Sequence, residues 1–204
     1  MLPFWHLGLA FSIPSGIYGV WASTLDVTVN QFGISQTEAG WLGFWGSTAG
    51  TLLGIIFSRF ADIFAKRMKL FLICIYISAT VFYVVFTLSC NQSIPGNKAL
   101  IYFTCISGGA VVSGALPLFY EMACERAYPA AEGVISGCIT LFLNLTGSLV
   151  LLLSFIPNIG TTWMNWALVS AMACAVLLMT TFNEQYWRRD VDIPDKTNQQ
   201  TPPP

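Results

Sequence analysis

The chain has 204 residues, of which 55% are hydrophobic and only 9% are charged, and its formal net charge is −1. Since about 25% of the residues in an ordinary soluble domain are charged, this composition excludes a typical soluble enzyme and a disordered chain. The small net charge also supplies no basic field for nucleic acid, so an integral membrane protein is the class that fits.

Six long apolar segments predict the architecture. They are Phe4–Leu25, Ala39–Phe57, Leu70–Leu88, Leu100–Tyr120, Gly133–Ile156 and Trp163–Phe182. Each has about 20 residues, the length that a helix needs to cross a bilayer. We therefore expect an all-α membrane protein, with a six-helix transmembrane region over residues 1–183. Residues 184–204 are polar and predict a disordered cytosolic tail.

The distribution of Lys and Arg predicts the orientation in the membrane. With six spans, eight of the nine basic residues fall on the side that holds both termini, and only Lys98 falls on the other. Cytosolic loops carry the excess of Lys and Arg in membrane proteins. Both termini are therefore expected in the cytosol.

The first segment carries an interrupted pattern. Pro14, Gly16 and Gly19 lie beside Tyr18 and Trp21. Pro removes a backbone hydrogen bond from a helix, and a Gly/Pro-interrupted span is the usual sequence pointer to a transporter site. A bent helix that serves packing alone is the alternative.

Two later segments carry small or polar residues at informative positions. Gly43, Gly46, Gly50 and Gly54 fall on one helical stripe, which predicts close packing against another helix. Asn144 lies near the middle of the fifth segment, where a buried amide must find a partner. That partner is either a neighbouring helix or a ligand in a cavity, and the sequence leaves both open.

Residue types that enzymes need are missing from the spans. The only histidine is His6, and no segment carries a charged residue near its centre. A metal site or a Ser-His-Asp triad needs a partnered histidine, and a charge within the membrane would by default mark a functional site. We therefore expect no enzyme, no catalytic residue, no metal and no cofactor.

The loop after the second segment resembles a signature of the major facilitator superfamily. It reads Ser-Arg-Phe-Ala-Asp-Ile-Phe-Ala-Lys-Arg-Met-Lys over residues 58–69. Asp62 matches the acid of that signature, and Lys66 and Arg67 match its basic pair. The resemblance implies a cytosolic latch that breaks and re-forms, so these three residues are expected to take part in gating.

A second stretch, Pro117–Gly133, resembles the loop between helices ten and eleven in solute carrier family 49. Its glutamates Glu121, Glu125 and Glu132 are expected to take part in gating, with helix-end capping and solvation as the alternative. Further resemblance to the disrupted-in-renal-carcinoma-2 branch of this family, which is related to the feline leukaemia virus subgroup C receptor-related proteins, lies in Ala39–Trp45, Arg59–Asp62 and Phe182–Tyr186.

The resemblance implies that the chain is the C-terminal half of a twelve-helix transporter, with its spans as helices seven to twelve. Such a transporter moves a small solute between two six-helix halves by alternating access. The expected partners are the lipid bilayer, the solute, and a missing N-terminal six-helix half or a homologous chain. A truncated isoform or regulatory membrane fragment that does not transport is the alternative.

The resemblance also implies substrate contacts. Tyr18 lies where relatives place a cavity-lining tyrosine, and Asn144 lies where choline-transporting relatives place a glutamine. The shorter Asn side chain disfavours a choline-type substrate and agrees with the branch that resembles a lysosomal exporter of small vitamins. We therefore expect Tyr18, Trp21 and Asn144 to bind a vitamin-, amine- or metabolite-like solute, in the lysosomal or the plasma membrane.

Overall fold

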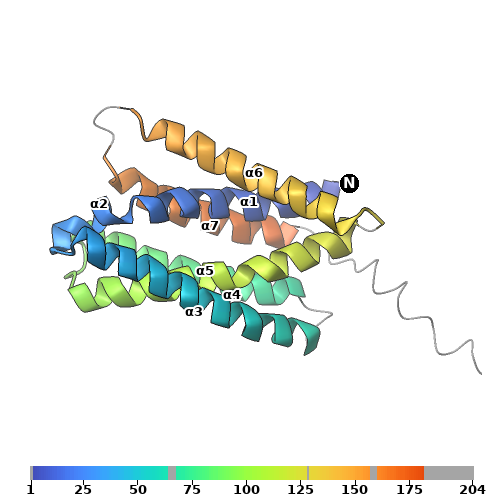
Figure 1. Cartoon of the computed structure of the whole chain (residues 1–204), viewed down its shortest axis with the longest axis horizontal. Helices are drawn as coiled ribbons and strands as arrows, with labels where there is room; N and C mark the ends of the chain where they lie inside the picture. The colour runs from blue at the N-terminus through green and yellow to red at the C-terminus, as the bar shows by residue number, and fades with distance from the viewer. Residues whose placement is uncertain (1, 64–67, 128, 157–159, 182–204) are drawn as a thin grey trace, which may run out of the picture.

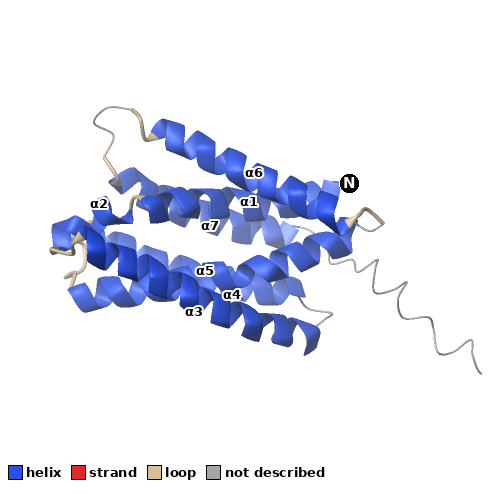
Figure 2. Ribbon diagram, in the orientation of Figure 1, coloured by secondary structure: helices blue, strands red, loops and turns tan. Residues whose placement is uncertain are grey.

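The computed structural model describes residues 2–63, 68–127, 129–156 and 160–181, with the backbone alone for residues 2–4 and 61–63. Its regular secondary structure in these ranges is helical (Figure 2). The helices are α1 (Leu2–Ser23), α2 (Leu25–Val29), the 3-10 helix η1 (Asn30–Phe32), α3 (Gln36–Ile63), α4 (Met68–Cys90), α5 (Lys98–Ala127), α6 (Glu132–Leu153) and α7 (Thr162–Thr181).

The long helices follow the six predicted segments, with ends that differ by a few residues. Among the described residues, five helices are long and apolar enough to cross a membrane, namely α3, α4, α5, α6 and α7. Helix α1 has 22 residues and lies alongside them (Figure 1), but its Gly, Ser, Pro, Trp and Tyr residues lower its hydropathy. The all-helical class is therefore confirmed, and the sixth span stays a prediction.

The six long helices alternate in direction (Figure 1). The start of α1, the end of α3 and the turn between α5 and α6 lie at one end of the bundle, on the right of the view. That end is the one predicted to face the cytosol. At the opposite end, Lys98 Nζ donates a hydrogen bond of 2.6 Å to the carbonyl oxygen of Gly33.

Helices α3 and α6 lie at opposite edges of the bundle (Figure 1). Helix α3 packs mainly on α5, and α6 packs mainly on α1, while α4 and α7 complete the interior. The apolar windows of α3 and α6 are accordingly only 22% and 17% buried, against 39% for α4, 50% for α5 and 44% for α7. The two edge helices therefore leave a large part of their surface uncovered.

Glycines allow the edge helix α3 to approach α5. A Cβ atom on Gly50 would lie 2.5 Å from the Cβ of Ser113, so no larger residue fits without movement. Gly46 and Gly54 also lie within contact distance of α5, whereas a Cβ on Gly43 would meet nothing within 4 Å. The packing prediction is therefore confirmed for three of the four glycines.

Helix α1 continues through Pro14 as a single helix. A Cβ on Gly16 would lie 2.7 Å from the carbonyl oxygen of Leu143 and 2.9 Å from the backbone nitrogen of Gly147. A Cβ on Gly19 would meet nothing within 4 Å. The interruption therefore serves packing against α6 at Gly16, and it leaves space on the helix one turn further on.

Candidate functional site

The candidate site is the surface between the two edge helices, which we call the open face. It comprises the uncovered sides of α3 and α6 and the parts of α1 and α5 that lie between them, with Tyr18, Thr51, Ser58, Tyr120, Thr140 and Asn144 as its polar side chains. Each of these side chains is exposed or half-buried.

Two different rows of exposed residues run along α6. One row is apolar and consists of Val134, Leu141, Leu145 and Leu152. The other row is small or polar and consists of Gly133, Gly137, Thr140, Asn144 and Ser148, at spacings of three and four. An apolar row suits lipid, whereas a polar row at membrane depth suits a protein-covered or water-filled surface.

The polar row faces α5. The hydroxyl oxygen of Tyr120 in α5 lies 3.0 Å from Oγ1 of Thr140. Asn144 Nδ2 donates a hydrogen bond of 2.8 Å to the carbonyl oxygen of Thr140, within its own helix. Asn144 is exposed, and among the described residues its side chain makes no hydrogen bond to another helix.

Tyr18 of α1 lies in the bundle next to α5. Its hydroxyl lies beside the side chain of Ser113, and a Cβ on Gly109 would lie 3.0 Å from it. Its ring stacks on Trp21, with centroids 6.1 Å apart and planes 24° apart. The half-buried Tyr18 therefore connects the aromatic interior of the bundle with the middle of α5.

Trp21, predicted to contact the substrate, lies inside the bundle in this structure. Its side chain is 2% exposed, and the rings of Tyr83 and Phe86 lie at 5.1 and 5.2 Å from it. Its indole Nε1 donates a hydrogen bond of 2.6 Å to Oδ1 of Asn165 in α7. Trp21 is therefore placed to position Tyr18 rather than to touch a solute.

Asn165 is one residue that sequence reasoning missed. It is 2% exposed, and it is the only amide side chain of the last apolar segment. The same signal had singled out Asn144, because a buried amide in an apolar helix must find a partner.

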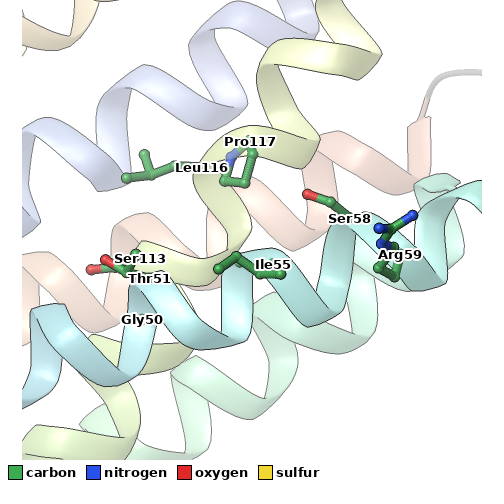
Figure 3. A pocket seen from close by; sticks show the side chains of 9 residues that line it. Gly50, Thr51, Ile55, Ser58, Arg59, Ser113, Leu116 and Pro117 are labelled. Atoms are coloured by element: carbon green, nitrogen blue, oxygen red, sulfur yellow. The ribbon is translucent and has the colours of Figure 1, made fainter.

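A groove of about 530 Å³ opens between α3 and α5 (Figure 3). Its lining consists of Gly50, Thr51, Gly54, Ile55, Ser58, Arg59, Ser113, Leu116 and Pro117. In Figure 3, Ile55 and Ser58 of α3 lie across from Pro117 of α5. The groove is mainly apolar, with hydroxyl groups along its length and the cationic Arg59 at the predicted cytosolic end.

The structure describes only part of the predicted gating residues. Asp62 lies in the last turn of α3, where the backbone alone is described, and Lys66 and Arg67 lie outside the described residues.

The three glutamates lie around the turn between α5 and α6, at the same end of the bundle as the end of α3 (Figure 1). Glu121 is half-buried, Glu125 is 6% exposed, and Glu132 is exposed in the first turn of α6. Burial of Glu125 does not fit the solvation alternative at that position.

Comparison with known proteins identifies relatives over nearly the whole chain. The chain is 33% identical over 188 residues to "Solute carrier family 49 member 4 homolog" of Xenopus tropicalis. This match covers 91% of this chain and 41% of the relative. The Xenopus laevis protein of the same name is 31% identical over 195 residues, covering 94% of this chain and 43% of the relative. Human "Choline/ethanolamine transporter FLVCR2" is 26% identical over 163 residues, covering 78% and 30%.

The chain therefore spans about two-fifths of the length of the first two relatives. No family model matches it. The relatives confirm the family that the two motifs predicted, and since they are transporters they also confirm that the chain is not an enzyme. Together with the apolar helices, they identify an integral, multi-pass membrane protein.

Proposed function

Because this chain is homologous over about nine-tenths of its length to transporters of solute carrier family 49, we propose that it forms one six-helix half of a major facilitator superfamily transporter. In this proposal its long helices are helices seven to twelve, and a second half covers the open face. A transporter of this class binds its solute between its halves near the bilayer midplane and alternates between two openings.

The observation that carries this proposal is the polar row of α6. Thr140 and Asn144 are exposed in the interior of α6, a helix long and apolar enough to cross a membrane, where a lipid-facing polar side chain would be costly. A second half would remove this row from lipid and would close a solute site between the halves. The uncovered surface of α3 and the groove beside it support the same arrangement.

The proposed solute is a small polar organic molecule, such as an amine or a vitamin-like heterocycle. Tyr18 offers a ring for stacking, and Asn144 offers an amide for hydrogen bonding. The name of the human relative states transport of choline and ethanolamine, which is compatible with an amine here.

The proposed gate lies at the cytosolic end of the bundle. Asp62 lies in the last turn of α3, and Lys66 and Arg67 come next in the sequence. The three glutamates surround the turn between α5 and α6, so Asp62 and the glutamates belong to the same end of the bundle. A charged cluster at one end suits a latch that opens in one state and closes in the other.

Residues 1–183 are proposed as the transmembrane half, residues 184–204 as a cytosolic tail, and the lysosomal or plasma membrane as the location. The proposed orientation rests on the distribution of Lys and Arg. Labelling of a single cysteine placed at position 198 tests this orientation. In intact cells that carry the protein in the plasma membrane, modification by a reagent added outside would contradict a cytosolic tail.

Uptake into proteoliposomes tests the transport proposal. The chain is reconstituted alone and together with a complementary six-helix half from a family 49 relative, and we call the second preparation the paired assembly. We expect uptake of labelled amines or vitamins only by the paired assembly. Folded protein that transports nothing in either preparation would instead favour a non-transporting membrane fragment.

A further inference from the structure

Tyr120 connects three helices at the edge of the open face, although no sequence pattern marked it as a site residue. Its ring packs against Phe11 of α1, with centroids 5.7 Å apart and planes 69° apart. Its hydroxyl reaches Thr140 of α6 at 3.0 Å. The side chain is therefore held at both its ring and its tip, which fixes the position of the phenolic oxygen.

The direction of the hydrogen bond between Tyr120 and Thr140 follows from the other contact of Thr140. Oγ1 of Thr140 lies 2.8 Å from the carbonyl oxygen of Ser136, which can only accept. The single hydroxyl hydrogen of Thr140 is therefore directed to Ser136, and Tyr120 must donate to Thr140. Tyr120 then has no hydrogen left for a ligand, and its oxygen can act toward a ligand only as an acceptor.

Asn144, on the polar row of α6, adds a second acceptor. Its Nδ2 donates to the carbonyl oxygen of Thr140, and this contact also fixes which end of the amide is nitrogen. Among the described residues, its Oδ1 accepts no hydrogen bond. Tyr120 of α5 and Asn144 of α6 therefore present two acceptor oxygens, against one remaining N–H of Asn144.

We propose that Tyr120, Thr140 and Asn144 form an acceptor subsite that binds an N–H group of the solute, such as a primary ammonium. This inference rests on the proposed function, because it names the class of solute for the same face. No Lys or Arg belongs to the polar row, so no cation there competes with a ligand ammonium. A quaternary ammonium lacks N–H groups and therefore cannot donate a hydrogen bond to the two acceptors.

The test compares two probes that differ only in their N–H groups, butylammonium and butyltrimethylammonium. Their affinities are measured as inhibition of uptake by the paired assembly and as thermal stabilisation of the purified assembly, which requires no transport. Loss of one hydrogen-bond partner corresponds to a change of about 5- to 150-fold. Tyr120→Phe removes the acceptor oxygen and keeps the ring. It should therefore weaken binding of butylammonium by that factor and leave binding of butyltrimethylammonium unchanged.

Thr140→Val gives the opposite shift and sharpens the test. Without the threonine hydroxyl, the O–H of Tyr120 is released and can donate to a ligand. Binding of butanoate, a carboxylate of similar size, should therefore improve while binding of butylammonium weakens. Thr80→Val is the matched control, because Oγ1 of Thr80 makes the same kind of bond to the carbonyl of Tyr76 in α4, away from the open face.

The outcomes separate the subsite from the proposed function. No uptake of any solute by a folded paired assembly would contradict the proposed function, and the thermal stabilisation data would still decide the subsite. Equal weakening of both ammonium probes by Tyr120→Phe would assign the tyrosine to packing alone and overturn the subsite. Unchanged affinities in both Tyr120→Phe and Thr140→Val would overturn it as well.

Discussion

Two amide side chains of this bundle are held in opposite ways. Asn165 of α7 is 2% exposed, and its oxygen accepts the indole N–H of Trp21 from α1. Asn144 of α6 is exposed, and its nitrogen donates to a carbonyl of its own helix. The first amide joins two helices, whereas the oxygen of the second accepts no hydrogen bond among the described residues.

The difference shows how burial separates a structural amide from a candidate ligand contact. Both residues are single strong amides in apolar helices, so the sequence signal is the same for each. A buried polar group must be paired within the bundle, and breaking that pair has a cost in stability. The exposed amide of Asn144 bonds only its own helix among the described residues, so its replacement should change binding and leave stability nearly intact.

The largest expected effect is on the buried side of this comparison. Trp21→Ala removes a large side chain that is 2% exposed and leaves Asn165 without its donor. Truncation of a buried Trp typically costs about 3–5 kcal/mol of unfolding free energy. Thermal unfolding in detergent should show this loss, whereas Trp5→Ala, at a position that is 44% exposed, should cost less. Equal losses in the two variants would contradict the structural role of Trp21.

A smaller loss is expected from the partner of Trp21. Asn165→Leu leaves the buried indole N–H of Trp21 unpaired, which should cost about 1–3 kcal/mol of stability. In a Trp21→Phe background the same substitution should cost less, because phenylalanine has no N–H group. Asn144→Leu is the matched control on the exposed side and should stay within about 0.5 kcal/mol of the parent. Additive losses of Trp21→Phe and Asn165→Leu would show that the hydrogen bond contributes nothing.

On the open face the expected effect is on affinity. Asn144→Ala and Tyr18→Ala in the paired assembly should each raise the apparent substrate constant about 5- to 150-fold, which corresponds to about 1–3 kcal/mol. Expression and unfolding temperature should stay close to the parent for Asn144→Ala, because Asn144 bonds only its own helix among the described residues. A variant that loses stability but keeps normal affinity would remove Asn144 from the site.

Much of the fold could be predicted because each long apolar run in the sequence corresponds to one long helix. The differences lie at helix ends. Helix α3 begins at Gln36 rather than near Ala39, since Ser35 and Glu38 form a reciprocal capping box in which Ser35 N–H donates to Oε2 of Glu38 at 2.7 Å. Helix α5 continues to Ala127 past its apolar run, and the five-residue α2 is too short to leave a periodic signal.

The candidate site could be predicted only in part. Asn144 and Tyr18 stand out as polar or aromatic residues within apolar segments, so single-residue reasoning finds them. The pairing of Trp21 with Asn165 joins residues 144 positions apart, and the contact of Tyr120 with Thr140 depends on how α5 and α6 face each other. Neither contact follows from residue spacing in the sequence, because each contact depends on how two separate helices pack.

The smallest effect on stability is expected at the end of the bundle. Asp62→Asn removes a charge in the last turn of α3, next to the basic pair that follows it in the sequence. An exposed ion pair contributes only about 0–1 kcal/mol, so the unfolding temperature should hardly change.

If Asp62 belongs to a latch that opens in each cycle, the maximal transport rate should nevertheless fall, with the apparent substrate constant little changed. Rates measured in the paired assembly with Asp62→Asn and with Asp26→Asn, a control in α2 at the opposite end, separate the two roles. A normal rate in Asp62→Asn would show that this stretch only orients the helices in the membrane, and the contrast between a structural and a functional polar residue would then be confined to the interior and the open face.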